Sequence, residues 1–172
     1  MHNRLAVAYV DSPLGELGLA GGEHGLITIS LGKRLDHLLP GLLKGRHDTG
    51  RGKHHPWEIL DQACNEIVEY MLSAREKFEV PLDLSSGTEF QRSVWRRLQK
   101  VKYGQPTSYA ELAENVGRPG AARAVGNAVG ANPLPIIIPC HRVLAAHGRL
   151  GGFSGGLPRK RKLLKIEGIE WK

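Results

Sequence analysis

Cysteine is scarce in this sequence: Cys64 and Cys140 are the only two among 172 residues, and they lie far apart. So few thiols argue against a disulfide framework and against a zinc site with four cysteine ligands. Eighteen consecutive apolar residues occur nowhere, and the N-terminus lacks the apolar block of a signal peptide. We therefore expect a cytoplasmic protein with no membrane partner.

Acidic residues are scarce in only one half of the chain. Residues 1–84 hold 9 Lys and Arg against 12 Asp and Glu, a net charge of −3, whereas residues 85–172 hold 15 against 5, a net charge of +10. A basic half is typical of a polyanion binder, because neutralising phosphates releases their condensed counterions. A merely solvated basic face is the alternative. The asymmetry favours nucleic acid.

The first half begins with three short β-prone runs, at residues 5–10, 17–20 and 26–31. Turn residues separate them, so we predict a small antiparallel sheet. From Asp36 to Pro56 no apolar period is present, which indicates a loop. Its histidines could bind a metal, but their spacing matches no zinc pattern, and we interpret them as solvated; they are His47, His54 and His55.

The first half ends with a helix and an extended segment. Apolar residues recur at three- and four-residue steps from Trp57 to Leu72, which predicts a helix that carries Cys64 on its inert, apolar stripe. Residues 78–84 then alternate, so Leu82 is expected to face the core and Asp83 to face solvent, with Pro81 keeping the segment at an edge. The Ser-Ser-Gly that follows marks a domain boundary, which gives domains of residues 1–84 and 85–172.

Three helices are predicted early in the second half. Thr88 and Gln91 form a capping box, and Ser108 opens a second helix in the same way with Glu111. A third helix covers residues 120–130 and has Pro119 at its first turn. Two short helices joined by a glycine-containing turn are typical of a helix-turn-helix. The third helix is rich in alanine and glycine, so it could approach DNA closely; tight helix packing is the alternative.

The segment after this helix places a thiol beside an imidazole. Ile136 to Ile138 are three β-branched residues in a row, which predicts a buried strand that Pro139 ends. Cys140 and His141 follow directly. A rigidly held thiol with a neighbouring base suits a nucleophile that needs an increased thiolate fraction. An inert, buried cysteine is the alternative interpretation.

A glycine-rich loop and a last helix complete the chain. Backbone amides of residues 148–156 could approach a ligand, although the lysine spacing of a phosphate-binding loop is missing. The helix from Pro158 to before Gly168 carries basic residues 159–162 in its first turn and Glu167 in its last, both opposed to the helix dipole. We expect this placement if the basic cluster serves phosphates and Glu167 pairs with an imidazole; solvated charges are the alternative.

Several of these motifs together resemble the O6-alkylguanine-DNA alkyltransferases, also called methylated-DNA–protein-cysteine methyltransferases. The resemblance covers nearly the whole chain. It implies an α+β fold with a small N-terminal antiparallel-sheet α/β domain of the RNase H-like type and a mainly helical C-terminal domain that binds DNA and transfers the alkyl group. The motifs that carry it are Pro139-Cys140-His141-Arg142-Val143, Asn132-Pro133, Ala121-Ala122-Arg123-Ala124-Val125-Gly126, Ser108-Tyr109 and Gly152-Phe153-Ser154-Gly155-Gly156.

The resemblance implies a single-turnover repair reaction. Cys140 would accept the alkyl group from O6-alkylguanine, and also from O4-alkylthymine, and the S-alkylated protein would then be inactive. His141 would take the thiol proton through a water, and Glu167 would orient the imidazole. Tyr109 would assist the departing guanine. The implied catalytic residues are Cys140, His141, Glu167, Asn132 and Tyr109.

The resemblance also implies how the damaged base is bound. The base would leave the duplex stack, Arg123 would fill the gap, and the helix-turn-helix would lie in the minor groove. The implied substrate-binding residues are Val143, Ser154, Phe153 and Gly155, and the implied DNA-binding residues are Arg123, Ala122, Ala124, Gly126, Asn127 and Tyr109. The partner would be double-stranded DNA containing alkylated guanine, bound by a monomer without cofactor or metal.

Two other functions stay open from the residues alone. One is a non-catalytic lesion sensor or helix-turn-helix regulator, which would use the basic half but not the thiol. The other is a thiol hydrolase that uses Cys140 and His141.

Overall fold

The computed structural model describes residues 5–33, 35 and 54–172. Most of the loop expected between residues 36 and 56 lies outside the described residues, and so does His47. The chain divides into two compact units, Met1–Ser86 and Gly87–Lys172.

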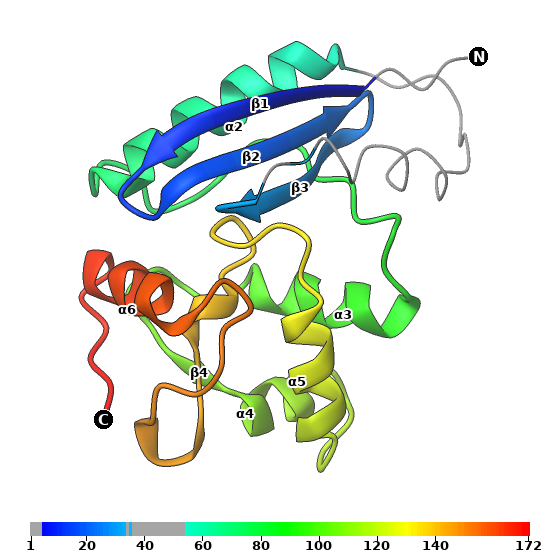
Figure 1. The fold of residues 1–172 in the computed structure, drawn as a ribbon. Coiled ribbons are helices and arrows are strands. Elements are labelled where there is room, and N and C mark those ends of the chain that lie inside the picture. Colours follow the sequence, from blue (N-terminus) through cyan, green and yellow to red (C-terminus); the bar gives the residue numbers. More distant parts are fainter. Residues whose placement is uncertain (1–4, 34, 36–53) are drawn as a thin grey trace. The chain divides into compact units, whose positions relative to one another are not determined.

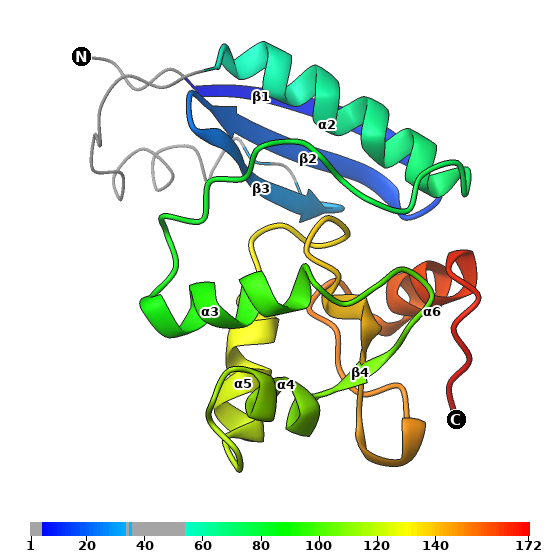
Figure 2. The ribbon, with the colours of Figure 1, turned by 180° about the vertical axis from the view of Figure 1, so that it is seen from behind.

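The first unit contains the antiparallel sheet that the β-prone runs predict. Strands β1 (Leu5–Ser12), β2 (Gly15–Gly22) and β3 (Gly25–Leu31) pair in the order β1-β2-β3. Helix α2 (Pro56–Met71) lies across one face of this sheet (Figures 1 and 2). Its buried residues include Ile59, Leu60, Ala63, Ile67 and Tyr70. The sheet and the helix are therefore confirmed.

The segment after α2 corrects one detail of the predicted alternation. Asp83 is buried, and its carboxylate accepts hydrogen bonds from the amide and hydroxyl of Ser85, at 3.0 and 2.6 Å. Leu82 is only partly buried and forms an isolated parallel bridge with Leu26. The expectation that Leu82 faces the core and Asp83 faces solvent was wrong, because the aspartate satisfies local backbone and hydroxyl donors that end the segment.

The second unit is mainly helical. It contains α3 (Glu89–Leu98), α4 (Tyr109–Asn115), α5 (Ala122–Gly130) and α6 (Leu157–Ile166), together with the short parallel pair β4 (Thr107–Ser108) and β5 (Val143–Leu144). Figure 1 shows α4 and α5 close together, joined by a tight turn. These two helices form the helix-turn-helix that the sequence predicts.

The helix starts follow the predicted capping residues with two corrections. Thr88 and Gln91 form the complete capping box of α3. At α4 only half of the box forms: Ser108 Oγ accepts the Glu111 amide at 3.1 Å, whereas the Glu111 carboxylate accepts from Thr107 Oγ1 at 2.9 Å. Pro119 lies in the turn rather than in the first turn of α5, because Gly120 has a positive φ of 83° that a right-handed helix excludes.

The prediction of a strand at residues 136–138 was wrong, but the prediction that these residues are buried is confirmed. All three isoleucines are buried, but the chain turns there, and the Ile138 amide donates to Leu134 O at 2.9 Å. Ile136 has a φ of 78°, which a strand does not allow. Prolines 135 and 139 flank the run and have no amide to donate to a ladder. Burial of apolar side chains thus stabilises a turn here, not a sheet.

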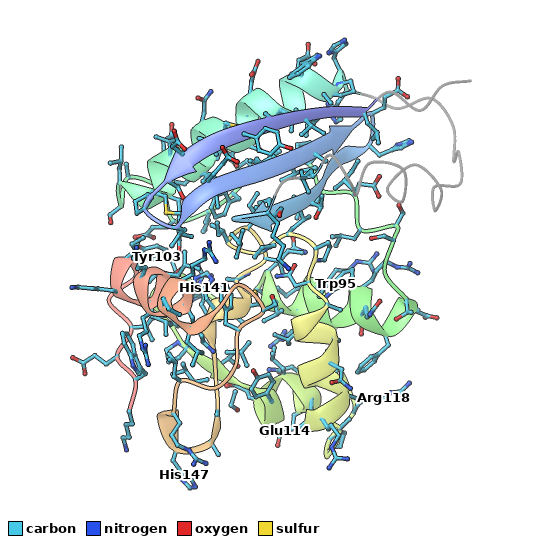
Figure 3. The ribbon with its side chains drawn as sticks, in the orientation of Figure 1. Trp95, Tyr103, Glu114, Arg118, His141 and His147 are labelled. Carbon is cyan, nitrogen blue, oxygen red and sulfur yellow. The ribbon has the colours of Figure 1, made fainter. Side chains whose placement is uncertain are left out.

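Trp95 joins α3 to α5 in the interior of the second unit. Its indole Nε1–H donates to Ala128 O at 2.8 Å, and the side chain points from α3 toward α5 (Figure 3). A Cβ added to Gly87 would lie 2.3 Å from Cζ3 of this ring. The ring is buried and planar, so it cannot yield easily.

We expect Gly87→Ala to lower the free energy of unfolding by about 1–3 kcal/mol, the usual cost of overpacking a core. Urea unfolding of both proteins measures the change. Gly130→Ala is the control, because a Cβ there meets nothing within 4 Å. Equal stability of the Gly87→Ala variant and the unaltered protein would contradict the close packing of Gly87 against the indole.

Candidate active site

Cys140 begins a 3-10 turn, Cys140–Arg142, directly after the buried isoleucine turn. Its amide donates to Ile138 O at 2.7 Å, which holds the residue rigidly. The side chain is 4% exposed and borders a cavity of about 200 Å³. The other residues that line this cavity are Tyr109, Gly126, Val129, Gly130, Gly152, Phe153 and Ser154.

The cavity brings together two of the four predicted substrate-binding residues and the predicted catalytic residue Tyr109. Tyr109 comes from α4, and Phe153 and Ser154 come from the glycine-rich loop. Gly126 of α5 lies under the Tyr109 ring, since a Cβ there would be 3.6 Å from the ring carbon Cδ1. Gly126, which was predicted to contact DNA, therefore forms part of the cavity wall.

Val143 and Gly155 do not border the cavity. Val143 is fully buried, and its carbonyl accepts a hydrogen bond from Lys160 Nζ at 2.7 Å. The Gly155 carbonyl accepts from Arg159 Nη1 at 3.0 Å. Their predicted contact with the base stays a prediction.

His141 and Glu167 form a buried pair behind the thiol. His141 Nε2 lies 2.6 Å from Glu167 Oε1, and both side chains are fully excluded from solvent. Figure 3 shows His141 in the interior of the second unit. Glu167 is the C-cap residue of α6, so the end of that helix positions the carboxylate.

Arg142 completes this cluster, and the sequence analysis missed it. Its Nε and Nη2 donate to the two carboxylate oxygens of Glu167 at 2.8 and 3.0 Å, a bidentate pair. Its Nη1 donates to Val101 O, and the guanidinium lies 5.8 Å from the centre of the Tyr103 ring. The amide of Gly104 also donates to Glu167 Oε2, at 3.0 Å. In the sequence, the only signal of this role was the position of Arg142 directly after the Cys-His pair.

These contacts set the protonation of the pair. Burial by itself would raise the pKa of Glu167, but the hydrogen bonds from His141 and Arg142 outweigh it and lower the pKa to about 2. The carboxylate is therefore ionised and can only accept, so His141 Nε2 carries the hydrogen. Burial lowers the pKa of His141, which is neutral at pH 7 and has Nδ1 as its basic nitrogen.

The Cys140 thiol is protonated in the free protein. Burial raises its pKa to about 11, and a hydrogen bond from Asn132 and the charge of Lys160 oppose this effect only in part. The increased thiolate fraction expected from the sequence is therefore not found at rest. Asn132 also donates to Ile138 O and accepts from the Leu134 amide, both at 2.9 Å, so it holds the turn that leads into Cys140.

The basic start of α6 differs from the sequence prediction at one position. Lys160 is fully buried and donates to two backbone carbonyls, so it cannot serve phosphates. Helical geometry turns this residue inward, whereas Arg161 and Lys162 beside it are exposed. The sequence alone could not assign the inward position among four consecutive basic residues.

Four of the six predicted DNA-contacting residues are on α5 and are exposed or partly exposed, whereas Gly126 and Tyr109 line the cavity. Arg123, Ala124 and Asn127 are exposed, and Ala122 is partly exposed. Figure 3 shows Arg118 in the turn before α5. Its guanidinium lies 5.7 Å from the centre of the Phe90 ring. Within the described ranges, no three His, Cys, Asp or Glu side chains gather as metal ligands would, and no helix is long and apolar enough to span a membrane.

Two family models match this chain. Residues 5–84 match the ribonuclease-like domain of 6-O-methylguanine DNA methyltransferase, and residues 89–169 match the DNA binding domain of the same family. Together they cover most of both units.

Similar proteins and structures agree with these matches. The chain is 42% identical over 158 residues to the methylated-DNA–protein-cysteine methyltransferase of Mycobacterium tuberculosis. The aligned residues cover 92% of this chain and 89% of the relative. It is 38% identical over 163 residues to that of Methanosarcina acetivorans, covering 94% and 97%. The crystal structure of Mycobacterium tuberculosis OGT in complex with DNA has a TM-score of 0.74 at 40% identity, covering 92% of this chain and 90% of that one.

We expect Glu167→Gln to lower the free energy of unfolding at pH 7 by about 3–5 kcal/mol, because Arg142 would keep a buried charge without its partner. The folded pKa of Glu167 lies below its ordinary value of 4.5, at about 2, so its contribution is present above pH 4.5 and lost as the pH falls toward 2. Urea unfolding across this window should show the two proteins converging in stability.

The exposed Glu170 provides the matched control, and Glu170→Gln should follow the unaltered protein at every pH. Stability curves for Glu167→Gln and the unaltered protein that stay parallel from pH 5 to pH 2 would refute the ionised, buried carboxylate.

Proposed function

Because the chain belongs to the 6-O-methylguanine DNA methyltransferase family, we propose that Cys140 accepts the alkyl group from O6-alkylguanine in double-stranded DNA. The reaction is direct-reversal repair: the bond between O6 and the alkyl carbon breaks, and a bond between the Cys140 sulfur and that carbon forms. The thiol proton ends on the restored guanine. A thioether is inert, so each molecule acts once.

The observation that carries this proposal is the position of the thiol. Cys140 borders the cavity on one side, and the neighbouring residue, His141, belongs to a buried imidazole–carboxylate pair. In the proposed mechanism, His141 Nδ1 takes the thiol proton through a water once the base enters. The ionised Glu167 stabilises the imidazolium that forms, as the carboxylate of a catalytic triad does. A thiol that is protonated at rest would then become a nucleophile only with substrate in place.

Tyr109 is proposed to assist the guanine leaving group. Burial raises the pKa of Tyr109, and a thiolate at Cys140 would raise it further, so its hydroxyl stays protonated and can donate. The Ser154 amide would be a second donor to the charge that develops. Asn132 would keep the turn before Cys140 in place. The carbonyls of Cys140 and Val143 would accept from the guanine amino group.

DNA is proposed to bind along α5. The exposed side contains small side chains and the cation Arg123, which suits a minor-groove contact that does not depend on sequence. Mycobacterium tuberculosis OGT was crystallised in complex with DNA, which supports the same partner for this chain. We also propose that O4-alkylthymine is a substrate, and that the protein acts as a monomer in the cytoplasm.

Incubation with duplex DNA that carries a labelled methyl group on guanine O6 tests the function. We expect one label per chain, on Cys140, because the thioether cannot react again. Cys140→Ser should bind the DNA and acquire no label. Label on another residue would rule out Cys140 as the acceptor, and protein that binds the DNA but acquires no label would indicate a lesion sensor. Turnover of esters or peptides beyond one equivalent would indicate a hydrolase.

A second test addresses Arg123. Arg123→Ala should slow repair of duplex DNA by about tenfold or more but leave the reaction with free O6-benzylguanine nearly unchanged, because the free base needs no extrusion from a stack. Single-turnover rates on both substrates measure the split. Arg96→Ala, an exposed arginine on α3, is the matched control. Equal losses on the two substrates would rule out the gap-filling role.

A further inference from the structure

Lys160 is a fully buried lysine for which the proposed mechanism has no role. It lies in the first turn of α6, where the helix dipole disfavours a positive charge. Its Nζ donates to Val143 O at 2.7 Å and to Gly152 O at 2.9 Å. Val143 directly follows the turn that carries Cys140, and Gly152 lines the same cavity as Cys140. One ammonium group therefore joins the segment that carries the thiol to the glycine-rich loop that borders its cavity.

The charge of Lys160 has no acidic counter-ion among the residues that the structure describes. Within residues 5–33, 35 and 54–172, no carboxylate lies within ion-pair distance of its Nζ. A buried charge that only carbonyl dipoles compensate is costly. Burial accordingly lowers the pKa of Lys160 to about 8, and the one ionisable group that opposes this shift is Cys140. The coupling is mutual, since the charge of Lys160 favours the Cys140 thiolate.

We propose that Lys160 is a positioning residue for alkyl transfer, which holds the Val143 and Gly152 carbonyls together and supplies the counter-charge of the Cys140 thiolate. The proposal rests on the proposed function, because the counter-charge matters only if Cys140 becomes a thiolate. No bond to Lys160 forms or breaks. The positive charge is already buried, with its Nζ hydrogen-bonded to the residue that follows the Cys140–Arg142 turn, so little solvent has to reorganise there when the thiol ionises.

The other charged and titratable groups around the thiol do not supply this charge. His141 is neutral at pH 7, and Lys160 itself helps to lower its pKa. Glu167 is negative, and the positive charge of Arg142 is paired with it. Tyr109, which also lines the cavity, is neutral. Lys160 is thus the cation that acts directly on Cys140.

The test measures the reactivity of Cys140 toward iodoacetamide as a function of pH, in a Cys64→Ala background so that only one thiol is labelled. Lys160→Met removes the charge and the donors, and Lys160→Gln removes the charge but keeps two N–H donors. Lys165→Met, an exposed lysine on the same helix, is the matched control. Circular dichroism and thermal unfolding establish that each variant is folded.

We expect both Lys160 variants to be labelled about tenfold more slowly than the Cys64→Ala parent at pH 7, the effect of one pKa unit on the thiolate fraction. The parent loses its own Lys160 charge as the pH rises through about 8. The difference should therefore shrink to less than about twofold near pH 10. A purely structural role would not produce a difference that disappears with pH.

Folded Lys160 variants whose labelling rates match the parent at pH 7, or differ from it equally at all pH values, would overturn the counter-charge role. If both variants unfold, Lys160 is a structural residue and the proposal also fails. Labelling needs no alkylated DNA, so the result is independent of the methyl-transfer experiment. A protein that shows the pH effect but transfers no methyl group would refute the proposed function instead.

Discussion

The buried carboxylate of Glu167 is the group on which the rest of the site depends. It accepts hydrogen bonds from His141, from Arg142 and from the Gly104 amide, so it joins the end of α6, the Cys140–Arg142 turn and the segment before β4. Four donors outweigh the cost of its burial and keep it ionised. The same contacts stabilise the second unit and select the imidazole tautomer, so stability and chemistry share one cluster.

The thiol illustrates how burial can protect a reactive group. Cys140 is protonated in the free protein because burial raises its pKa to about 11. A protonated thiol reacts slowly with adventitious electrophiles. A protein that can act only once gains from such protection, because a wasted thiol cannot be recovered. In the proposed mechanism, the thiol becomes reactive through His141 and Lys160, which are hydrogen-bonded to Glu167 and to the Val143 carbonyl.

Small residues shape both the cavity and the outer side of α5. Gly126 lets the Tyr109 ring lie against the helix, and Gly130 and Gly152 border the same cavity. On the outer side, the exposed Ala124 and Asn127 have shorter side chains than the exposed Arg123. The same helix thus carries exposed residues on the proposed DNA surface and glycines that line the cavity.

The sequence alone determined the local elements: apolar period and turn residues predicted the sheet and α2, and Thr88 and Ser108 marked two helix starts, because these signals act within a few residues. Adjacent Cys140 and His141 indicated the chemistry.

Only the tertiary structure decided the rest. It made a buried turn of Ile136 to Ile138, which periodicity cannot distinguish from a strand. It brought Glu167 and Arg142 together around His141, and it turned Lys160 inward among four basic residues, because burial and charge pairing depend on segments that are distant along the chain.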